Sequence, residues 1–174
     1  LLTLILALLG PLAVAGGSHY GTPAGAPASF GGQVSEWSVP TPAFARDPAV
    51  APDGAIFIAV MMGNKVARFD PANQSFKEWE LPPKHHPHGL LVDRKGIVWT
   101  TGNGNGTIGR LDPATGTMRE FPAPARDGGP HTLVISDDGG TLWFTLQSGN
   151  RIGRLDTASG RIAEYPTSGG PYGI

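Results

Sequence analysis

Three histidines crowd one short stretch of the chain, KHHPHGLLVDRKGIVWTT, which runs from Lys84 to Thr101. An imidazole can serve as a general base, bind a metal ion, or exchange hydrogen bonds with the backbone. His85, His86 and His88 therefore raise three possibilities: a metal site, a catalytic base with neighbours, or the entrance to an ordinary strand. The stretch alone does not choose among them, but a second Pro-His pair, at His131 in GPHTL, lies one repeat further on.

A metal site is the least favoured of these readings. Structural and catalytic zinc ions take three or four ligands in a fixed geometry, and neither a cysteine nor an acid accompanies the three histidines. The glycine-rich run from Gly102 to Gly106, GNGNG, also lacks the lysine and the following helix of a phosphate-binding loop. We therefore expect no metal on His85, His86 and His88.

The histidines belong to a sequence repeat. RFDPANQSFKEWELP begins at Arg68, RLDPATGTMREFPAP at Arg110 and RLDTASGRIAEYPTS at Arg154, so the spacing is 42 and then 44 residues. Two further columns keep the same rhythm, one of glutamate and one of aromatic residues: Glu78, Glu120 and Glu164, and Phe57, Trp99 and Trp143. A repeat of about 40–45 residues with short strands is typical of a β-propeller blade.

Each unit divides into four predicted strands. In the middle unit they cover 88–92, 97–101, 107–111 and 117–121. In DPATG, proline fixes φ at the second turn position and Gly116 accepts the left-handed conformation. Gly160 matches Gly116, but Gln74 stands there in the first unit, so we expect Asn73 to take over that conformation.

The sequence therefore predicts an all-β fold, a partial β-propeller of about three four-stranded blades over residues 33–174. The abundance of glycine (26) and proline (17) suits many strands joined by tight turns. The last residues, GGPYGI, read as the opening of another unit, so we expect the sequence to be the N-terminal piece of a longer propeller. Trp99 and Trp143 are expected in the core, and Arg68, Arg110 and Arg154 in ion pairs with Asp70, Asp112 and Asp156.

The N-terminal run LLTLILALLGPLAVAGG is typical of a secretory signal peptide. We predict a signal peptide over residues 1–15, with cleavage after Ala15, and a flexible linker over residues 16–32. The apolar run is shorter than the roughly 20 residues of a membrane span, although an uncleaved anchor is an alternative. We thus expect a periplasmic or secreted protein without a membrane span after cleavage. With 13 basic and 14 acidic side chains, the chain does not resemble a nucleic-acid binder.

In an up-and-down blade, the residue that enters the first strand lies on the same face as the loop that leaves the second. Arg46, His88, His131 and Tyr172 occupy this entry position in successive units. We predict that they converge at the mouth of the propeller channel and bind a small-molecule or peptide ligand there. The competing reading is architectural, with each imidazole capping a backbone carbonyl. His85 and His86 have no counterpart in the next unit, so we expect them in an exposed connecting loop.

Units that read PHGL, W.T, N.IGRLD and EYP resemble the streptogramin lyase family, typified by virginiamycin B lyase. The resemblance covers residues 36–174 and implies a seven-bladed propeller. It also implies a magnesium-dependent carbon–oxygen lyase that opens a cyclic ester by elimination. The family's catalytic pattern pairs a histidine of E-P-H-G-I with a glutamate of W-F-x-x-E, while a second Pro-His histidine helps to bind substrate.

His88 and His131 match the histidines of that pattern, but the acids are missing. Gly102 and Asn103 stand where the glutamate would follow Trp99. Leu146 and Gln147 stand there after Trp143, and His86 and Gly129 replace the acid before each Pro-His pair. The catalytic residues are therefore unknown, and we expect the catalytic blade outside this sequence.

Three functions remain open. The first is a carbon–oxygen lyase in which a histidine removes the proton beside the ester carbonyl and magnesium stabilises the developing enolate. The second is a non-catalytic periplasmic or extracellular propeller that binds a ligand or protein through the same mouth. The third, a gluconolactonase-like metal hydrolase, would need channel-facing acids that this sequence lacks.

Overall fold

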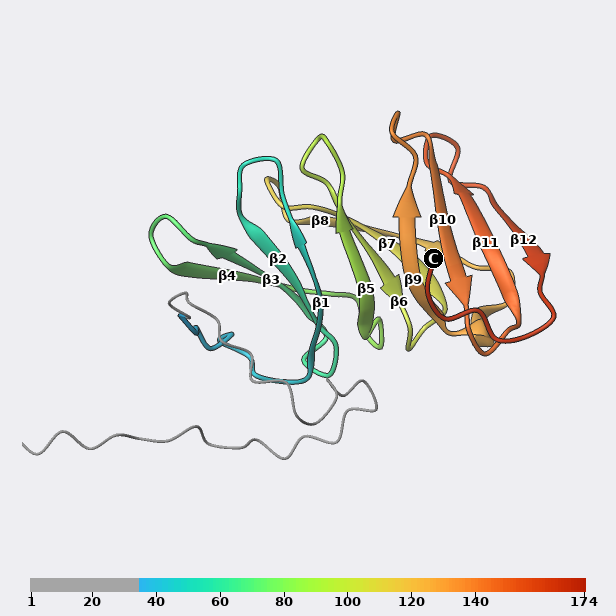
Figure 1. The fold of residues 1–174 in the computed structure, drawn as a ribbon, viewed down its shortest axis with the longest axis horizontal. Coiled ribbons are helices and arrows are strands. Elements are labelled where there is room, and N and C mark those ends of the chain that lie inside the picture. The colour runs from blue at the N-terminus through green and yellow to red at the C-terminus, as the bar shows by residue number, and fades with distance from the viewer. Residues whose placement is uncertain (1–34) are drawn as a thin grey trace, which may run out of the picture. The chain divides into compact units, whose positions relative to one another are not determined.

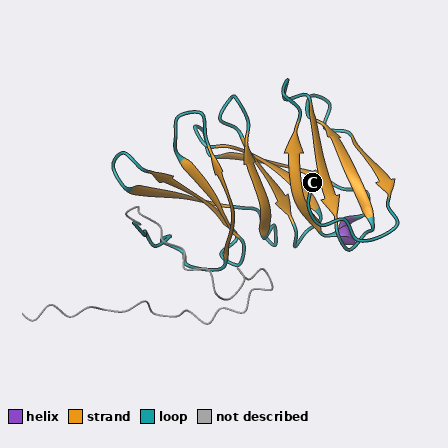
Figure 2. Ribbon diagram, viewed as in Figure 1, coloured by secondary structure: helices purple, strands orange, loops and turns teal. Residues whose placement is uncertain are grey.

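The structure, a computed structural model, describes residues 35–174. The predicted signal peptide and linker, residues 1–15 and 16–32, lie outside these residues. The described part holds twelve strands and one short 3-10 helix, η1, which is the purple element of Figure 2. The elements are β1 (Ala45–Val50), β2 (Ile56–Val60), β3 (Lys65–Asp70), β4 (Ser75–Glu80), β5 (Pro87–Val92), β6 (Val98–Gly102), β7 (Thr107–Asp112), β8 (Thr117–Pro122), η1 (Arg126–Gly128), β9 (Pro130–Ile135), β10 (Thr141–Leu146), β11 (Arg151–Asp156) and β12 (Ile162–Pro166).

The strands form three antiparallel sheets of four, here called blades 1, 2 and 3, in the strand orders β1-β2-β3-β4, β5-β6-β7-β8 and β9-β10-β11-β12. Each strand pairs with the next one in the chain, so the blades are simple meanders. The first strands of successive blades lie beside one another, β1 next to β5 and β5 next to β9 (Figure 1). This arrangement confirms the predicted all-β fold of four-stranded propeller blades.

Burial changes from the first strands of a blade to the last. All five residues of β6 are buried, whereas exposed and half-buried residues alternate along most of β4 and β8. A strand that is covered on both faces can be apolar throughout, while an outer strand keeps the two-residue period of a one-sided surface. Among residues 35–174, no helix is long and apolar enough to cross a membrane.

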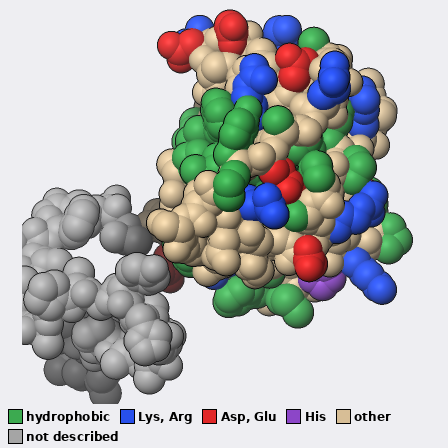
Figure 3. Space-filling view, turned by 90° about the vertical axis from the view of Figure 1, so that its right-hand side faces the viewer, with side chains coloured by type: hydrophobic (Ala, Val, Ile, Leu, Met, Phe, Trp, Pro, Cys, Tyr) green, Lys and Arg blue, Asp and Glu red, His purple; other side chains and the backbone are tan. Residues whose placement is uncertain are grey.

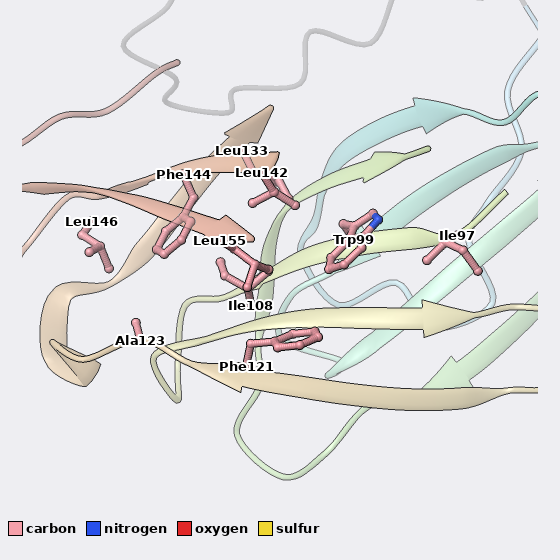
Figure 4. Packing of buried hydrophobic residues seen from close by; sticks show 10 residues of the cluster. All are labelled: Ile97, Trp99, Ile108, Phe121, Ala123, Leu133, Leu142, Phe144, Leu146 and Leu155. Atoms are coloured by element: carbon pink, nitrogen blue, oxygen red, sulfur yellow. The ribbon is translucent and has the colours of Figure 1, made fainter. Parts of the chain in front are cut away.

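Two apolar cores hold the blades together, one at each blade-to-blade interface. Figure 4 shows the core between blades 2 and 3, where Trp99 and Phe121 meet Leu133, Phe144 and Leu155. Blades 1 and 2 share a second core, in which Phe57 and Val66 meet Leu90, Val98 and Leu111. Each core is formed when the facing sides of two sheets interdigitate, as in a β-sandwich.

The two tryptophans of the repeat column differ in burial. Trp99 is 2% exposed in the core between blades 2 and 3, as predicted. Trp143 is half-buried and packs on Tyr165 with ring centroids 5.9 Å apart. Side chains alternate across a strand, and Leu142 and Phe144 are the residues of β10 that enter the core with blade 2. Trp143 therefore lies on the opposite face of its blade.

The β3–β4 turn departs from the prediction. Gln74 itself adopts the left-handed conformation, with φ of 58°, in the same place as Gly116 and Gly160. Asn73 instead accepts a hydrogen bond from the Ser75 N–H through its side chain, at 3.0 Å. The backbone path of the turn is thus kept in all three blades, and in blade 1 a residue with a Cβ atom has to adopt it.

The arginine column forms a predicted ion pair in blade 1 alone. Arg68 contacts Asp53 at 3.0 Å and Asp70 at 3.5 Å. Arg110 instead lies over the Trp99 ring, and Arg154 donates to the Thr141 hydroxyl. Between residues 35 and 174, neither Asp112 nor Asp156 pairs with its neighbouring arginine. These guanidinium groups lie beside an aromatic ring or a hydroxyl on the neighbouring strand, so two of the three predicted pairs are wrong.

Candidate ligand-binding site

The four predicted site residues come from the entry segments of successive units. Arg46, His88 and His131 lie near the starts of β1, β5 and β9, and Tyr172 follows β12. At each of the three strand entries the pairing with the second strand is irregular, between Ala45 and Pro48, Pro87 and Leu90, and Pro130 and Leu133. Such bulges turn a side chain out of the regular alternation of the strand. Because the same irregularity recurs, the equivalent side chain of each blade leaves the regular alternation at the same place.

The structure brings these four residues together in one row. The Arg46 guanidinium donates a hydrogen bond to Nε2 of His88. The rings of His88 and His131 lie 3.7 Å apart between centroids, and those of His131 and Tyr172 lie 4.2 Å apart. We call Arg46, His88, His131 and Tyr172 the entry row. Its members come from three blades and from the segment after the last one.

Two buried threonines hold the backbone of the entry row. Thr101, on β6, accepts a hydrogen bond from the Gly89 N–H and donates one to the His131 carbonyl, both at 2.7 Å. Thr145, on β10, likewise accepts from the Thr132 N–H at 3.1 Å and donates to the Tyr172 carbonyl at 3.1 Å. Each hydroxyl therefore joins one row position to the next. Sequence reasoning missed both residues, although each lies two positions after a tryptophan of the repeat.

Burial sets the charge of the row. His88 and His131 are 6% and 4% exposed, and Nδ1 of each ring is buried without a hydrogen-bond partner among residues 35–174. Burial, with the neighbouring His131 and Arg46 acting in the same direction, lowers the pKa of His88 to about 4. Burial and Arg46 also lower the pKa of His131. Both imidazoles are therefore uncharged at neutral pH, and Arg46 supplies the positive charge of the row.

This arrangement favours binding over proton abstraction. His88 accepts from Arg46 at Nε2, so in its neutral form it carries its proton on Nδ1 and has no free lone pair. The nearest acid in sequence is Asp47, which follows Arg46 where Gly89 and Thr132 stand in the other blades. Burial raises the pKa of Asp47, against the opposing effects of Arg46 and His131. The row thus combines one cation, two neutral rings and a phenol.

The positions of the family's catalytic glutamate hold amides with other roles. The Asn103 amide donates to the Pro130 carbonyl at 3.1 Å and so supports the entry of blade 3. Gln147 is exposed, and its backbone N–H donates to the Gly129 carbonyl at 3.3 Å. Neither side chain can act as a carboxylate base. As in the sequence, these positions therefore hold no histidine–glutamate pair that could act as the family's catalytic pair.

His85 contradicts the prediction of an exposed loop residue. Its side chain is completely buried, with Nδ1 2.7 Å from the Glu120 carboxylate and Nε2 2.8 Å from the Thr100 hydroxyl. The order carboxylate, imidazole, hydroxyl resembles a hydrolase triad, but the hydroxyl of Thr100 is also fully buried and no substrate can reach it. His86 is half-buried. Because both ring nitrogens of His85 are already used, the three histidines do not share a metal ion.

His85 is held by the glutamate column of the repeat. Glu120 also accepts from Asn105 at 2.7 Å and Thr107 at 2.9 Å, and the hydrogen bond from His85 is the main reason that the pKa of Glu120 falls to about 2. Glu78 accepts from the backbone and hydroxyl of Thr41, and Glu164 accepts from the Ala125 N–H. Each glutamate therefore fastens the segment that enters its own blade. His85 supplies the contact in blade 2.

Comparison with known proteins places this architecture. A family model described as the virginiamycin B lyase family matches residues 26–174. A virginiamycin B lyase of Nocardia farcinica is 38% identical over 92 residues, which are 52% of this chain and 32% of that protein.

The solved structures give the same picture. A catalytically inactive histidine-to-alanine variant of virginiamycin B lyase from Staphylococcus aureus, with quinupristin, matches with a TM-score of 0.75 and 31% identity, over 82% of this chain and 49% of that one. A streptogramin B lyase structure matches with a TM-score of 0.72 and 27% identity, over 80% and 47% of the two chains. This chain spans about half the length of these solved relatives. By the match of the family model to residues 26–174, the chain belongs to the virginiamycin B lyase family.

Proposed function

We propose that this chain forms the substrate-binding part of a carbon–oxygen lyase that opens a cyclic ester by elimination. The observation that carries the proposal is the entry row, a set of polar side chains that converge from successive blades of a virginiamycin B lyase family propeller. Nε2 of His88 is occupied by Arg46, and neither row histidine has a glutamate at the position of the family pattern, so we assign the row to substrate binding and not to proton removal. The catalytic residues remain unassigned.

The four residues of the entry row differ in how much of each side chain is exposed. Tyr172 is 45% exposed and Arg46 is half-buried, so these two side chains offer the larger contact surface. A guanidinium donates to the carbonyl oxygens of an ester or peptide, and a phenol ring offers an apolar face with a polar end. His88 and His131 present little more than an edge, and they fix Arg46 and Tyr172 in place.

Magnesium does not suit the entry row. Mg²⁺ prefers octahedral oxygen ligands, usually carboxylates, substrate oxygens and water. The row offers two imidazoles, a phenol and a guanidinium, and no cluster of three metal-binding side chains occurs between residues 35 and 174. Magnesium dependence therefore stays a prediction from the family resemblance, and no step of this proposal passes through a metal held by these residues.

A second function is favoured by the missing glutamates. With Asn103 and Gln147 in place of the acid, the described blades fit a propeller that binds a ligand without converting it. In this case the same row is the binding surface, and the ligand is again a small molecule or peptide. Basic and acidic side chains are interspersed on the face that Figure 3 shows, which does not resemble the basic stripe of a nucleic-acid binder.

Quinupristin, named with the solved relative, is a suitable test ligand. The full-length protein that contains this chain is incubated with it, with and without Mg²⁺, and the products are separated and weighed by mass spectrometry. Elimination yields a ring-opened isomer of unchanged mass, whereas hydrolysis adds one water. An unchanged mass with altered retention supports the lyase, and added water indicates a hydrolase instead.

Binding is measured separately by calorimetry on the same full-length protein. We expect Arg46→Ala and Tyr172→Ala to weaken quinupristin binding by about 1–3 kcal/mol each, because each removes a polar or ring contact. Lys84→Ala, at an exposed position outside the row, is the matched control. Binding without turnover supports the non-catalytic function, and the absence of both contradicts both proposals.

We further propose that the protein is exported. The support is the apolar run over residues 1–15 with its small residues Ala13 and Ala15. Mass spectrometry of the N-terminus of the protein recovered from its native host should show that the mature chain begins at Gly16. Recovery of a chain that retains residues 1–15 would contradict cleavage.

A further inference from the structure

A second hollow lies on the other side of the blades from the entry row. Its volume is about 530 Å³, and residues of blades 1 and 2 line it. They come from the β1–β2, β5–β6 and β7–β8 turns and from β2, β3 and β4. The β1–β2 and β5–β6 turns lie at the top of the view in Figure 1, at the opposite ends of the strands that begin with the row. One strand of five or six residues, roughly 17–20 Å, therefore separates the two places.

The walls of this hollow, which we call the turn pocket, are apolar with a cationic rim. Trp79 and the buried Phe57, whose ring centroids lie 6.0 Å apart, contribute the aromatic part. Arg68, Lys77, Arg94 and Lys95 also line it, with Asp53 as the one acid among the lining residues. A volume of this size lies in the range of small-molecule sites, in which apolar walls and a few polar groups act together.

Two of the four cations already have partners. Arg68 is paired with Asp53 at 3.0 Å, and Arg94 with Asp137 at 3.2 Å. Lys77 lies over the Trp79 ring, with its Nζ 4.6 Å from the centroid, and neither it nor Lys95 makes an ion pair with any residue from 35 to 174. Lys77 belongs to blade 1 and Lys95 to blade 2. An anion in the pocket would thus meet an ammonium group from each blade.

The cations of the β5–β6 turn are not a product of the repeat. Asp93, Arg94 and Lys95 correspond to Ala51, Pro52 and Asp53 in blade 1, and to Ser136, Asp137 and Asp138 in blade 3, because the first residue of each turn makes the same backbone hydrogen bond. Blade 2 therefore carries Arg94 and Lys95 where blade 1 carries Pro52 and Asp53 and blade 3 carries two aspartates. A smaller hollow of about 260 Å³ lies between the β5–β6 and β9–β10 turns, where Arg94 and Lys95 face Asp137 and Asp138. The repeat alone would not supply Arg94 and Lys95 to the turn pocket.

We propose that the turn pocket binds a small organic anion with an aromatic or other apolar body. The carboxylate, sulfonate or phosphate would lie between Lys77 and Lys95, and the apolar part would lie against Trp79. The chain's own residues 1–34 contain no aspartate or glutamate, so they offer no side-chain anion that could take its place. This site is independent of the proposed lyase function and of the entry row.

Naphthalene-2-sulfonate is a probe with this chemistry, and naphthalene-2-sulfonamide is its uncharged counterpart. We expect saturable calorimetric binding of the sulfonate to the purified chain, at least tenfold tighter than that of the sulfonamide. Lys95→Glu and Lys77→Glu should each weaken sulfonate binding at least tenfold. Lys84→Glu makes the same change of charge outside the pocket and should leave it unchanged, as should Arg46→Ala in the entry row.

Three results would overturn the proposal. The sulfonamide could bind as tightly as the sulfonate, in which case the cations play no part. Lys84→Glu could weaken binding as much as Lys95→Glu, which would indicate a general effect of net charge. The sulfonate could also fail to saturate. None of these results bears on quinupristin binding at the row, so the two proposals fail separately.

Discussion

At the scale of single residues, His85 departs most clearly from the role that the sequence suggests. His85 has no counterpart in the other blades, yet it is the most completely buried and fastened of the histidines. A repeat identifies positions that the architecture uses in every blade, and it identified His88 and His131 correctly as row positions. It cannot reveal that one blade replaces a backbone N–H or a threonine with an imidazole, because that contact depends on Glu120, 35 residues away.

The buried network of His85 should contribute strongly to stability. His85→Phe keeps an aromatic ring but leaves the buried Thr100 hydroxyl without the imidazole and removes one of the three side-chain donors to Glu120. We expect the free energy of unfolding to fall by about 2–4 kcal/mol, because an uncompensated buried polar or charged group is costly. Urea denaturation measures this change. His86→Phe, at the next position, is the control, and an equal loss in both variants would return His85 to the role of an ordinary loop residue.

The row histidines should make stability depend on pH. The pKa of His88 is lowered from 6.5 to about 4 in the folded chain, so the unfolded chain binds the proton more readily. The stabilisation is complete above about pH 6.5 and is lost as the pH falls toward about 4. Because burial also lowers the pKa of His131, the two contributions act in the same window.

Denaturation curves at pH 4.5 and 7.5 test this dependence. His88→Gln removes one titrating group, and we expect it to reduce the difference in the free energy of unfolding between these pH values by about 1–3 kcal/mol. The test compares how much the free energy of unfolding changes between the two pH values in each protein. A loss of stability that is equal at both pH values therefore does not interfere. A wild-type chain and a variant with parallel pH profiles would show that His88 keeps its ordinary pKa when folded.

At the scale of elements, the sequence predicts most of the structure because each blade is made by local patterns. The four strands of the middle unit lie within one residue of their predicted limits. Turn chemistry and strand alternation depend on neighbours in the chain, which a reader of the sequence can see. The two wrong ion pairs, those of Arg110 and Arg154, depend on a choice among nearby aromatic and polar partners. Trp143 is less buried than Trp99 because blade 3 is the last blade among residues 35–174.

The β3–β4 turn of blade 1 offers a direct test of turn chemistry. Gln74 has a φ of 58°, where Gly116 and Gly160 have 74° and 76°. We expect Gln74→Gly to raise the free energy of unfolding by about 0.5–1 kcal/mol, because relief of the Cβ strain outweighs the added freedom of the unfolded chain. Thermal denaturation measures the gain. The reciprocal change Gly116→Gln in blade 2 should lower stability, and a gain there would show that the turns are not equivalent.

At the scale of the whole described molecule, the blades are joined by apolar cores and by a few polar bridges beside the proposed binding surface. The cores resist separation of the sheets but have little directional preference. Thr101 and Thr145, by contrast, fix the backbone of one row position to that of the next. The geometry of the entry row and the contact between blades therefore depend on the same hydroxyl groups. Two threonines of the repeat can in this way align side chains that belong to separate sheets.

This dependence leads to a prediction about coupling between blades. Thr101→Val preserves the shape of the side chain but leaves the Gly89 N–H and the His131 carbonyl without their partner, and we expect a loss of about 2–4 kcal/mol. In a repeat protein, a weakened interface should loosen the blade beyond it more than the others. Native-state hydrogen exchange should thus show reduced protection in β9 to β12, with smaller changes in β2 and β3. Thr117→Val, on the exposed side of β8, makes the same chemical change without a bridge. A uniform loss of protection across all three blades of the Thr101 variant would show that the hydroxyl supports global stability and does not couple one blade to the next.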